Sequence, residues 1–197
     1  QANWQFVKLA FAIPNQTMSG LATILSLAGE HHQATQLTSA ELSNSAFRQE
    51  ASQIIQSVSN FNTIGQDVWA FVARGTGFTD IGIAPESQWL NNLNGLLANE
   101  TPRFSYPYYV FVFDFPLAQW NDTVTTDEVR QAVVKLGDWM LNNNQQNRLK
   151  LYGLRPVSGT LSAADALFAD AERYGIQLNP ELTNVIQPLA LNDLQSL

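Results

Sequence analysis

Apolar and polar positions alternate along the chain in blocks that are typical of α/β proteins. Residues 6–13 form an apolar run of strand length, and apolar side chains then recur every three or four positions from Leu21 to Ala28. This pattern predicts a strand, a short polar turn and an amphipathic helix. Because the first four amides of a helix have no intrahelical acceptor and carry the positive end of its dipole, we expect residues 14–20 to face a polar ligand.

The same alternation continues toward the C-terminus. Helical spacing recurs in five later segments, at residues 38–58, 64–72, 89–97, 126–152 and 162–174. The first of them opens with the capping-box sequence Thr38–Glu41, and Thr126 precedes the longest. Strands are expected at residues 80–84, as a short buried strand, and at residues 108–115. The segment beyond Gly175 is expected to form an irregular tail on the surface.

Strands that alternate with helices predict a mixed sheet flanked by helices on both faces, in one α/β domain over residues 1–197. The length and the 45% hydrophobic content are sufficient for a core. No apolar stretch reaches the roughly 18 residues that a membrane-spanning helix needs. Because there is no cysteine, the sequence excludes disulfides and thiolate ligands.

The charge balance argues against nucleic acid as a partner. Seventeen acidic and ten basic residues give a net charge of −7, so the long-range field repels phosphate backbones. No P-loop, G-x-G-x-x-G, H-E-x-x-H or G-x-S-x-G sequence occurs. His31 and His32 are adjacent on a predicted helix, and adjacent helical residues do not face one metal ion. We therefore expect no cofactor, no metal and no catalytic residue.

Three predicted turns converge on one edge of the sheet, at residues 15–20, 62–65 and 84–87. Ligands of open α/β sheets bind outside the carboxyl ends of the strands, where helix N-termini also point. Asn15 and Thr17 can donate side-chain hydrogen bonds there, or satisfy the turn itself. Glu86 can bind a cation or an amine, or stabilise the helix that follows it. Tyr106 can cover a ligand or pack in the core.

Several short motifs occur in series along most of the chain. They are Val7–Pro14 followed by Ser19–Ala22, Val68–Gly75, Asp80–Ile83 with Glu86 and Ser87, Tyr106–Pro107, Phe113–Pro116, and the G-x-R-P turn within Tyr152–Pro156. This series resembles the second lobe of bacterial extracellular solute-binding proteins, in the branch often fused to a von Willebrand factor A domain. The resemblance implies a type II periplasmic-binding fold, in which two α/β lobes clamp a solute, and a distant relation to molybdate-binding proteins.

The resemblance also implies where a ligand would be held. It maps ligand contacts on the helix start Ser19–Gly20, on Ile64 at the next helix start, and on the strand exit at residues 84–86. The chain departs from the family at residues 75–78, where Gly-Thr-Gly-Phe replaces an acidic turn, and at Pro85 and Glu86, which occupy the place of a tyrosine. Since Glu86 would repel an oxyanion, oxyanion specificity is not expected.

By the same resemblance, residues 1–115 correspond to the lobe core and residues 116–197 to C-terminal helices and a tail. The first lobe is expected to be missing, so the chain is expected to be a fragment or a single-lobe form. The implied location is the periplasm, the extracellular space or the cell envelope. The implied partners are a transporter membrane component and a fused or associated von Willebrand factor A domain.

We therefore expect a non-enzymatic module that binds a small polar solute at helix N-termini, for ABC-type transport or sensing. Two alternatives stay open. One is a cell-envelope interaction or scaffold protein that has kept the fold without a solute site. The other, ranked last, is a hydrolase that uses aspartate or glutamate, for which Asp114, Asp122, Asp127 and Glu128 are the candidates.

Overall fold

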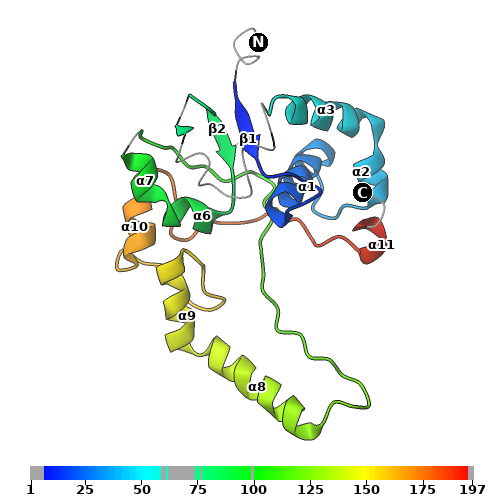
Figure 1. The fold of residues 1–197 in the computed structure, drawn as a ribbon, viewed down its shortest axis with the longest axis vertical. Coiled ribbons are helices and arrows are strands. Elements are labelled where there is room, and N and C mark those ends of the chain that lie inside the picture. Colours follow the sequence, from blue (N-terminus) through cyan, green and yellow to red (C-terminus); the bar gives the residue numbers. More distant parts are fainter. Residues whose placement is uncertain (1–6, 59–60, 62–73, 76, 99, 195–197) are drawn as a thin grey trace. The chain divides into compact units, whose positions relative to one another are not determined.

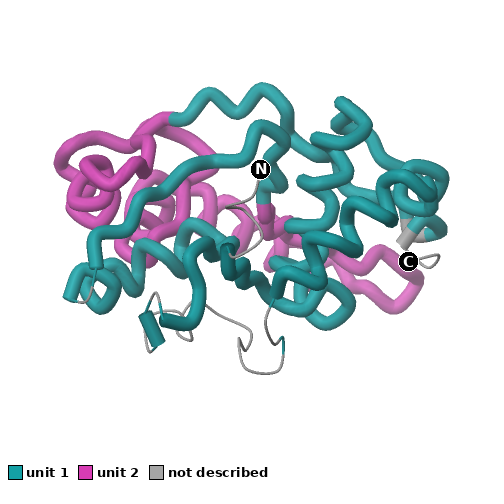
Figure 2. Tube along the Cα trace, turned by 90° about the horizontal axis from the view of Figure 1, so that it is seen from above, with its two compact units in different colours: residues 1–112, 180–197 teal, residues 113–179 magenta. Residues whose placement is uncertain are grey.

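The computed structural model describes residues 7–58, 61, 74–75, 77–98 and 100–194. The chain forms two compact units (Figure 2). Unit 1 consists of residues 1–112 and 180–197, and unit 2 consists of residues 113–179. The family resemblance implies a division after residue 115 within one domain, with the tail grouped with the C-terminal helices. In the structure residues 180–197 of the tail belong to unit 1.

Unit 1 carries both strands and most of the short helices (Figure 1). Its elements are β1 (Leu9–Phe11), α1 (Met18–His32), α2 (Ser39–Ser43), α3 (Ser45–Gln56), β2 (Ile81–Ile83), α6 (Glu86–Asn91), α7 (Leu93–Leu97) and α11 (Leu191–Leu194). The predicted helices at residues 21–28 and 38–58 are confirmed, the second as two helices with the expected capping box at Thr38. The predicted helix at residues 89–97 is divided at Asn92, and the one at residues 64–72 lies outside the described residues.

The two strands form a parallel pair, which confirms a mixed α/β structure. Leu9 pairs with Ile81 and Phe11 with Ile83, and this is the whole sheet within the described residues. The strand predicted at residues 108–115 is wrong. Only Val110 of that segment pairs, through an isolated bridge to Val185 of the tail. The aromatic and β-branched residues of this segment do favour a strand. A strand also needs a neighbour to pair with along its length, and residue composition does not reveal whether one is present.

β2 is not the buried strand that its apolar sequence predicted. The exposed fractions of Ile81 and Ile83 are 44% and 41%, whereas Ala10 and Phe11 of β1 are 1% and 0% exposed. A short apolar run indicates a strand but not how many layers cover it. Ile81 and Ile83 are two positions apart and so point to the same face of β2, and their exposure shows that the described residues leave much of that face uncovered.

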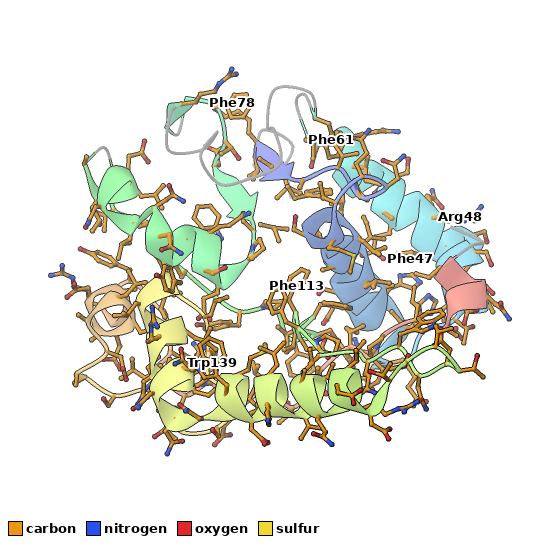
Figure 3. All side chains as sticks on the ribbon, turned by 60° about the horizontal axis from the view of Figure 1, so that its bottom comes forward. Phe47, Arg48, Phe61, Phe78, Phe113 and Trp139 are labelled. Carbon is orange, nitrogen blue, oxygen red and sulfur yellow. The ribbon has the colours of Figure 1, made fainter. Side chains whose placement is uncertain are left out.

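The core of unit 1 gathers around α1. Phe47 of α3 lies against α1 (Figure 3). The buried members of this cluster are Leu25, Ala28, Leu37, Leu42, Phe47, Ala51, Tyr109 and Ile186. The tail was predicted to pack on the surface, and it also contributes Ile186, which is 2% exposed, to the core. A Cβ atom on Gly29 would lie 2.5 Å from Ile186 Cδ1, so glycine is what allows the tail to approach α1 this closely.

Unit 2 is helical in its described elements, which are α8 (Asp127–Leu141), α9 (Asn143–Leu149), the 3₁₀ turn η2 (Lys150–Tyr152) and α10 (Ala166–Glu172). The long helix expected over residues 126–152 is interrupted at Asn142, whose backbone is extended with ψ 148°. The Asn142 side chain accepts hydrogen bonds from the amides of Asn144 and Gln145, at 2.9 and 3.2 Å. Because the Asn142 side chain caps a new helix, it favours a break at this position over the continuation of α8.

A largely buried ion pair ties the parts of unit 2 together. Lys150 Nζ lies 3.2 Å from Asp165 Oδ1, and both side chains are mostly covered. The Ser162 amide donates to Asp165 Oδ2 at 2.7 Å. This hydrogen bond, together with Lys150, lowers the pKa of Asp165 below its ordinary value.

Replacement of Gly29 by alanine is expected to destabilise the protein by about 1–3 kcal/mol, because the added methyl group must displace Ile186 or Tyr109. Urea unfolding measures this change. Gly77→Ala is the matched control, since its Cβ would meet its nearest atom at 3.8 Å and should cost about 0.5 kcal/mol or less. Equal losses in the two variants would contradict the close approach of the tail to α1.

The Asp165 pair predicts a dependence of stability on pH. A carboxyl group whose pKa is lowered by folding stabilises the protein above its unfolded pKa of about 4 and loses that contribution as the pH falls through the folded value. The free energy of unfolding should therefore fall on acidification below about pH 4, and Asp165→Asn should flatten that fall. Parallel pH profiles of the wild type and the variant would contradict this role.

Candidate functional site

The parallel pairing of β1 and β2 brings two helix starts to one edge of the pair. β1 ends at Phe11 and leads through a six-residue connection into α1, while β2 ends at Ile83 and leads through two residues into α6. Phe11 and Ile83 are register partners, so the two strands end side by side (Figure 1). The edge where ligands of α/β sheets bind is thus formed here by the beginnings of α1 and α6.

The turn after β1 is closed by its own hydrogen bonds. The Gln16 and Thr17 amides donate to the Ile13 carbonyl oxygen at 3.2 and 3.1 Å. The Thr17 hydroxyl donates to the same oxygen at 3.0 Å and accepts from the Gly20 amide at 3.1 Å. Thr17 is therefore the N-cap of α1, and its side chain satisfies the turn, which is one of the two roles proposed for it.

Two amides remain at the start of α1. Among the described residues, the Met18 and Ser19 N–H groups have no hydrogen-bond acceptor, and the first intrahelical bond runs from the Leu21 amide to the Thr17 carbonyl. The Ser19 hydroxyl lies 3.5 Å from Thr17 Oγ1, which is a weak contact. Asn15 is exposed on the same turn. The helix start thus has two donors of partial positive charge that no described acceptor satisfies.

Gly20 acts through packing. Its residue is buried, and a Cβ atom there would lie 2.3 Å from the Ala12 carbonyl oxygen and 2.6 Å from that of Ile13. Its amide is already bound to Thr17. Gly20 therefore allows α1 to begin in contact with the end of β1, and the amides left for a ligand are those of the two residues before it.

The start of α6 joins two of the predicted site residues that are 20 positions apart. The Tyr106 hydroxyl donates to Glu86 Oε1. A second contact supports the same arrangement, because the rings of Trp89 and Phe104 lie 5.8 Å apart. The segment before residue 107 thus runs along α6 and places a phenol on the carboxylate. The remaining predicted contact, Ile64, lies outside the described residues.

These groups can recognise a molecule by both signs of polarity. The Met18 and Ser19 amides donate hydrogen bonds, whereas the Glu86 carboxylate accepts them and carries negative charge. A simple oxyanion is favoured by the amides but repelled by Glu86. A solute with both an acceptor group and a hydroxyl or amine donor satisfies both parts.

The other sequence candidates are engaged in local structure. Asp80 Oδ2 accepts the Lys8 amide at 2.9 Å, so this carboxylate has a structural role. His31 Nδ1 lies 2.6 Å from Glu50 Oε2, and His32 Nε2 lies 3.0 Å from the Glu41 carbonyl oxygen. In the part of the chain that the structure describes, no three His, Asp or Glu side chains gather where they could hold a metal ion.

Two of the carboxylates considered for hydrolysis are held in their ionised form. The pKa of Asp122 is lowered, chiefly by the Thr125 hydroxyl, and that of Glu128 by its own backbone amide and the Thr126 hydroxyl. A general acid needs the opposite shift. Asp127 pairs with Arg130 at 2.8 Å. These contacts organise the turn before α8 and its first turn.

The sequence predicts α8 as a helix with an apolar stripe but does not indicate whether that stripe is covered. No residue of α8 is buried. The spacing that predicted the helix was correct, yet periodicity indicates only that a face is apolar. Trp139, at the C-terminal end of α8, is 54% exposed (Figure 3).

No protein-family model, no curated protein and no solved structure matches this chain. The likeness to solute-binding proteins therefore stays a prediction. Among the described residues, no helix combines the length and apolar character needed to cross a membrane.

Thr17→Ala is expected to lower the free energy of unfolding by about 1 kcal/mol, because it removes the acceptor of the Gly20 amide. Thr17→Ser keeps the hydroxyl and should lose much less. Chemical denaturation of the two variants measures the difference. If serine and alanine were equally destabilising, the hydroxyl would not be the cap.

Proposed function

We propose that unit 1 is a solute-binding lobe that holds a small polar solute at the carboxyl ends of β1 and β2. The observation that carries the proposal is the pair of acceptor-free amides at Met18 and Ser19, placed at the same strand edge as the Glu86 carboxylate. Helix N-termini at this edge are the usual ligand positions of α/β sheets. The two amides and the Glu86 carboxylate can bind a solute without a catalytic group, so the proposed function is non-enzymatic binding.

The proposed solute carries both hydrogen-bond acceptors and donors. A carboxylate or hydroxyl oxygen would accept from the two amides, and an amine or hydroxyl would donate to Glu86. Tyr106, which donates to Glu86, would orient that carboxylate. Zwitterionic amino acids and sugars have this composition, whereas inorganic oxyanions lack the donor. The net charge of −7 argues against polyanions such as nucleic acid.

The finer parts of the proposal follow the family resemblance. They are a type II periplasmic-binding lobe with a mixed sheet flanked by helices on both faces, a location in the periplasm, the extracellular space or the cell envelope, and service to transport or sensing. A transporter membrane component and a von Willebrand factor A domain are the proposed macromolecular partners. A first lobe closing over the solute would couple binding to a conformational change.

A second function, an interaction or scaffold protein, is favoured by a different observation. α8 of unit 2 presents Leu136, Trp139 and Met140 to solvent, and none of its residues is buried. Large exposed apolar surfaces are typical of protein interaction sites. This function does not need the polar edge of unit 1, so the two candidates can be separated by experiment.

A thermal-shift screen of amino acids, sugars and small anions tests the first function. A solute present at about 100 times its dissociation constant should stabilise the protein by about 2.7 kcal/mol, which raises the melting temperature by several degrees. Glu86→Gln should reduce the shift for solutes that carry an amine or hydroxyl donor. Asp170→Asn, an exposed carboxylate of unit 2, is the control that removes the same charge elsewhere.

The results of the screen test both the site and the choice between the two functions. A shift that survives Glu86→Gln would place the solute elsewhere and contradict the site. No shift with any compound would contradict solute binding and favour the interaction protein.

A further inference from the structure

α8 carries a long and regular apolar face that is mostly exposed within the described part of unit 2. We define the α8 stripe as Val129, Val133, Leu136, Trp139 and Met140. Val133 is half-buried, and the other four are exposed. Their spacing of three and four residues places them along one side of a 15-residue helix. A helix of this length is marginal in water when nothing packs on it.

We propose that the α8 stripe is an interface between two copies of this chain, which pair through antiparallel α8 helices. This goes beyond solute binding, because it uses unit 2 alone and none of the groups at the β1–β2 edge. Apolar residues repeated at three and four positions are the pattern with which helices pair lengthwise. Two copies of one helix bury identical stripes against each other in a closed, two-fold arrangement.

The charges beside the stripe favour a second copy as the occupant. Glu128 and Lys135 are seven residues apart, so they lie two turns apart on the same flank of the helix. Neither forms an ion pair within the described part of the chain. The nearby Arg130 does, with Asp127 at 2.8 Å. The flank of the stripe therefore carries one negative and one positive charge that form no ion pair among the described residues, although the Glu128 carboxylate accepts hydrogen bonds from its own amide and the Thr126 hydroxyl.

The antiparallel direction makes this flank complementary to itself. A two-fold axis between residues 131 and 132 places Glu128 of each copy opposite Lys135 of the other, which gives two equivalent ion pairs. A parallel pair in register would place like charges together. The antiparallel arrangement also sets the two helix dipoles head to tail. Opposite charges that flank a helix seam determine partner and direction.

The same register covers apolar groups outside α8. Residues 139 and 124 are symmetric about that axis, so Trp139 of one copy reaches the turn that holds Val124 of the other. Val124 is 81% exposed, and the neighbouring Trp120 indole N–H donates to Asp122, which fixes the ring at the surface. Since the helix is about 22 Å long, the shared surface lies at the small end of specific interfaces, and a weak dimer is expected.

Sedimentation of the full chain over a range of about 1 to 300 μM tests the proposal. The wild type should pass from monomer to dimer across this range. Glu128→Lys and Lys135→Glu should each raise the dissociation constant about tenfold or more, because every attractive pair becomes repulsive. The double variant, Glu128→Lys with Lys135→Glu, exchanges the two charges and should return within about threefold of the wild type.

Asp138→Lys is the matched control, since it makes the same charge reversal on the side of α8 away from the stripe and should leave the dissociation constant unchanged. Circular dichroism of each variant checks that the helices are retained. A chain that stays monomeric at every concentration would overturn the proposal, as would a dimer that the single reversals do not weaken. Failure of the double variant to recover, with the helices retained, would also overturn it. None of these results bears on the solute screen, which probes unit 1.

Discussion

The backbone of Lys8 sets the register on which unit 1 depends. Its amide donates to the Asp80 carboxylate at 2.9 Å, and its carbonyl oxygen accepts from the Asp80 amide and the Thr79 hydroxyl, both at 2.9 Å. These bonds fix β2 beside β1 immediately before the paired residues. Because a slip of one residue would turn every side chain to the other face, this clamp determines that Phe11 is buried and that both strands end together.

The end of β1 and the start of α1 satisfy two demands that compete for the same atoms. Stability requires that helix amides find acceptors, whereas a ligand requires that some stay available. The Thr17 hydroxyl accepts a hydrogen bond from the Gly20 amide. Because Gly20 has no side chain, the helix can begin against the Ala12 carbonyl oxygen. The amides of Met18 and Ser19 have no hydrogen-bond acceptor in the part of the chain that the structure describes. The cap therefore stabilises α1 and leaves two of its amides without an acceptor among the described residues.

The two units use apolar side chains differently. In unit 1 they converge on α1 and form a core that includes Phe47 and, from the tail, Ile186. In unit 2 the buried apolar side chains among the described residues are few, and the long helix α8 keeps its stripe at the surface. Folding and recognition both depend on the burial of apolar surface. In our proposals, unit 1 recognises a polar solute and unit 2 recognises an apolar surface.

The sequence by itself determined what local rules decide: the helices at residues 18–32 and 39–56, the capping box at Thr38 and the polar turn before α1. These depend on neighbours within four positions. Only the tertiary structure decided the exposure of β2, the single bridge at Val110 and the contact of Tyr106 with Glu86. Periodicity shows that a face is apolar, but distant segments determine what covers it, and that information is not local.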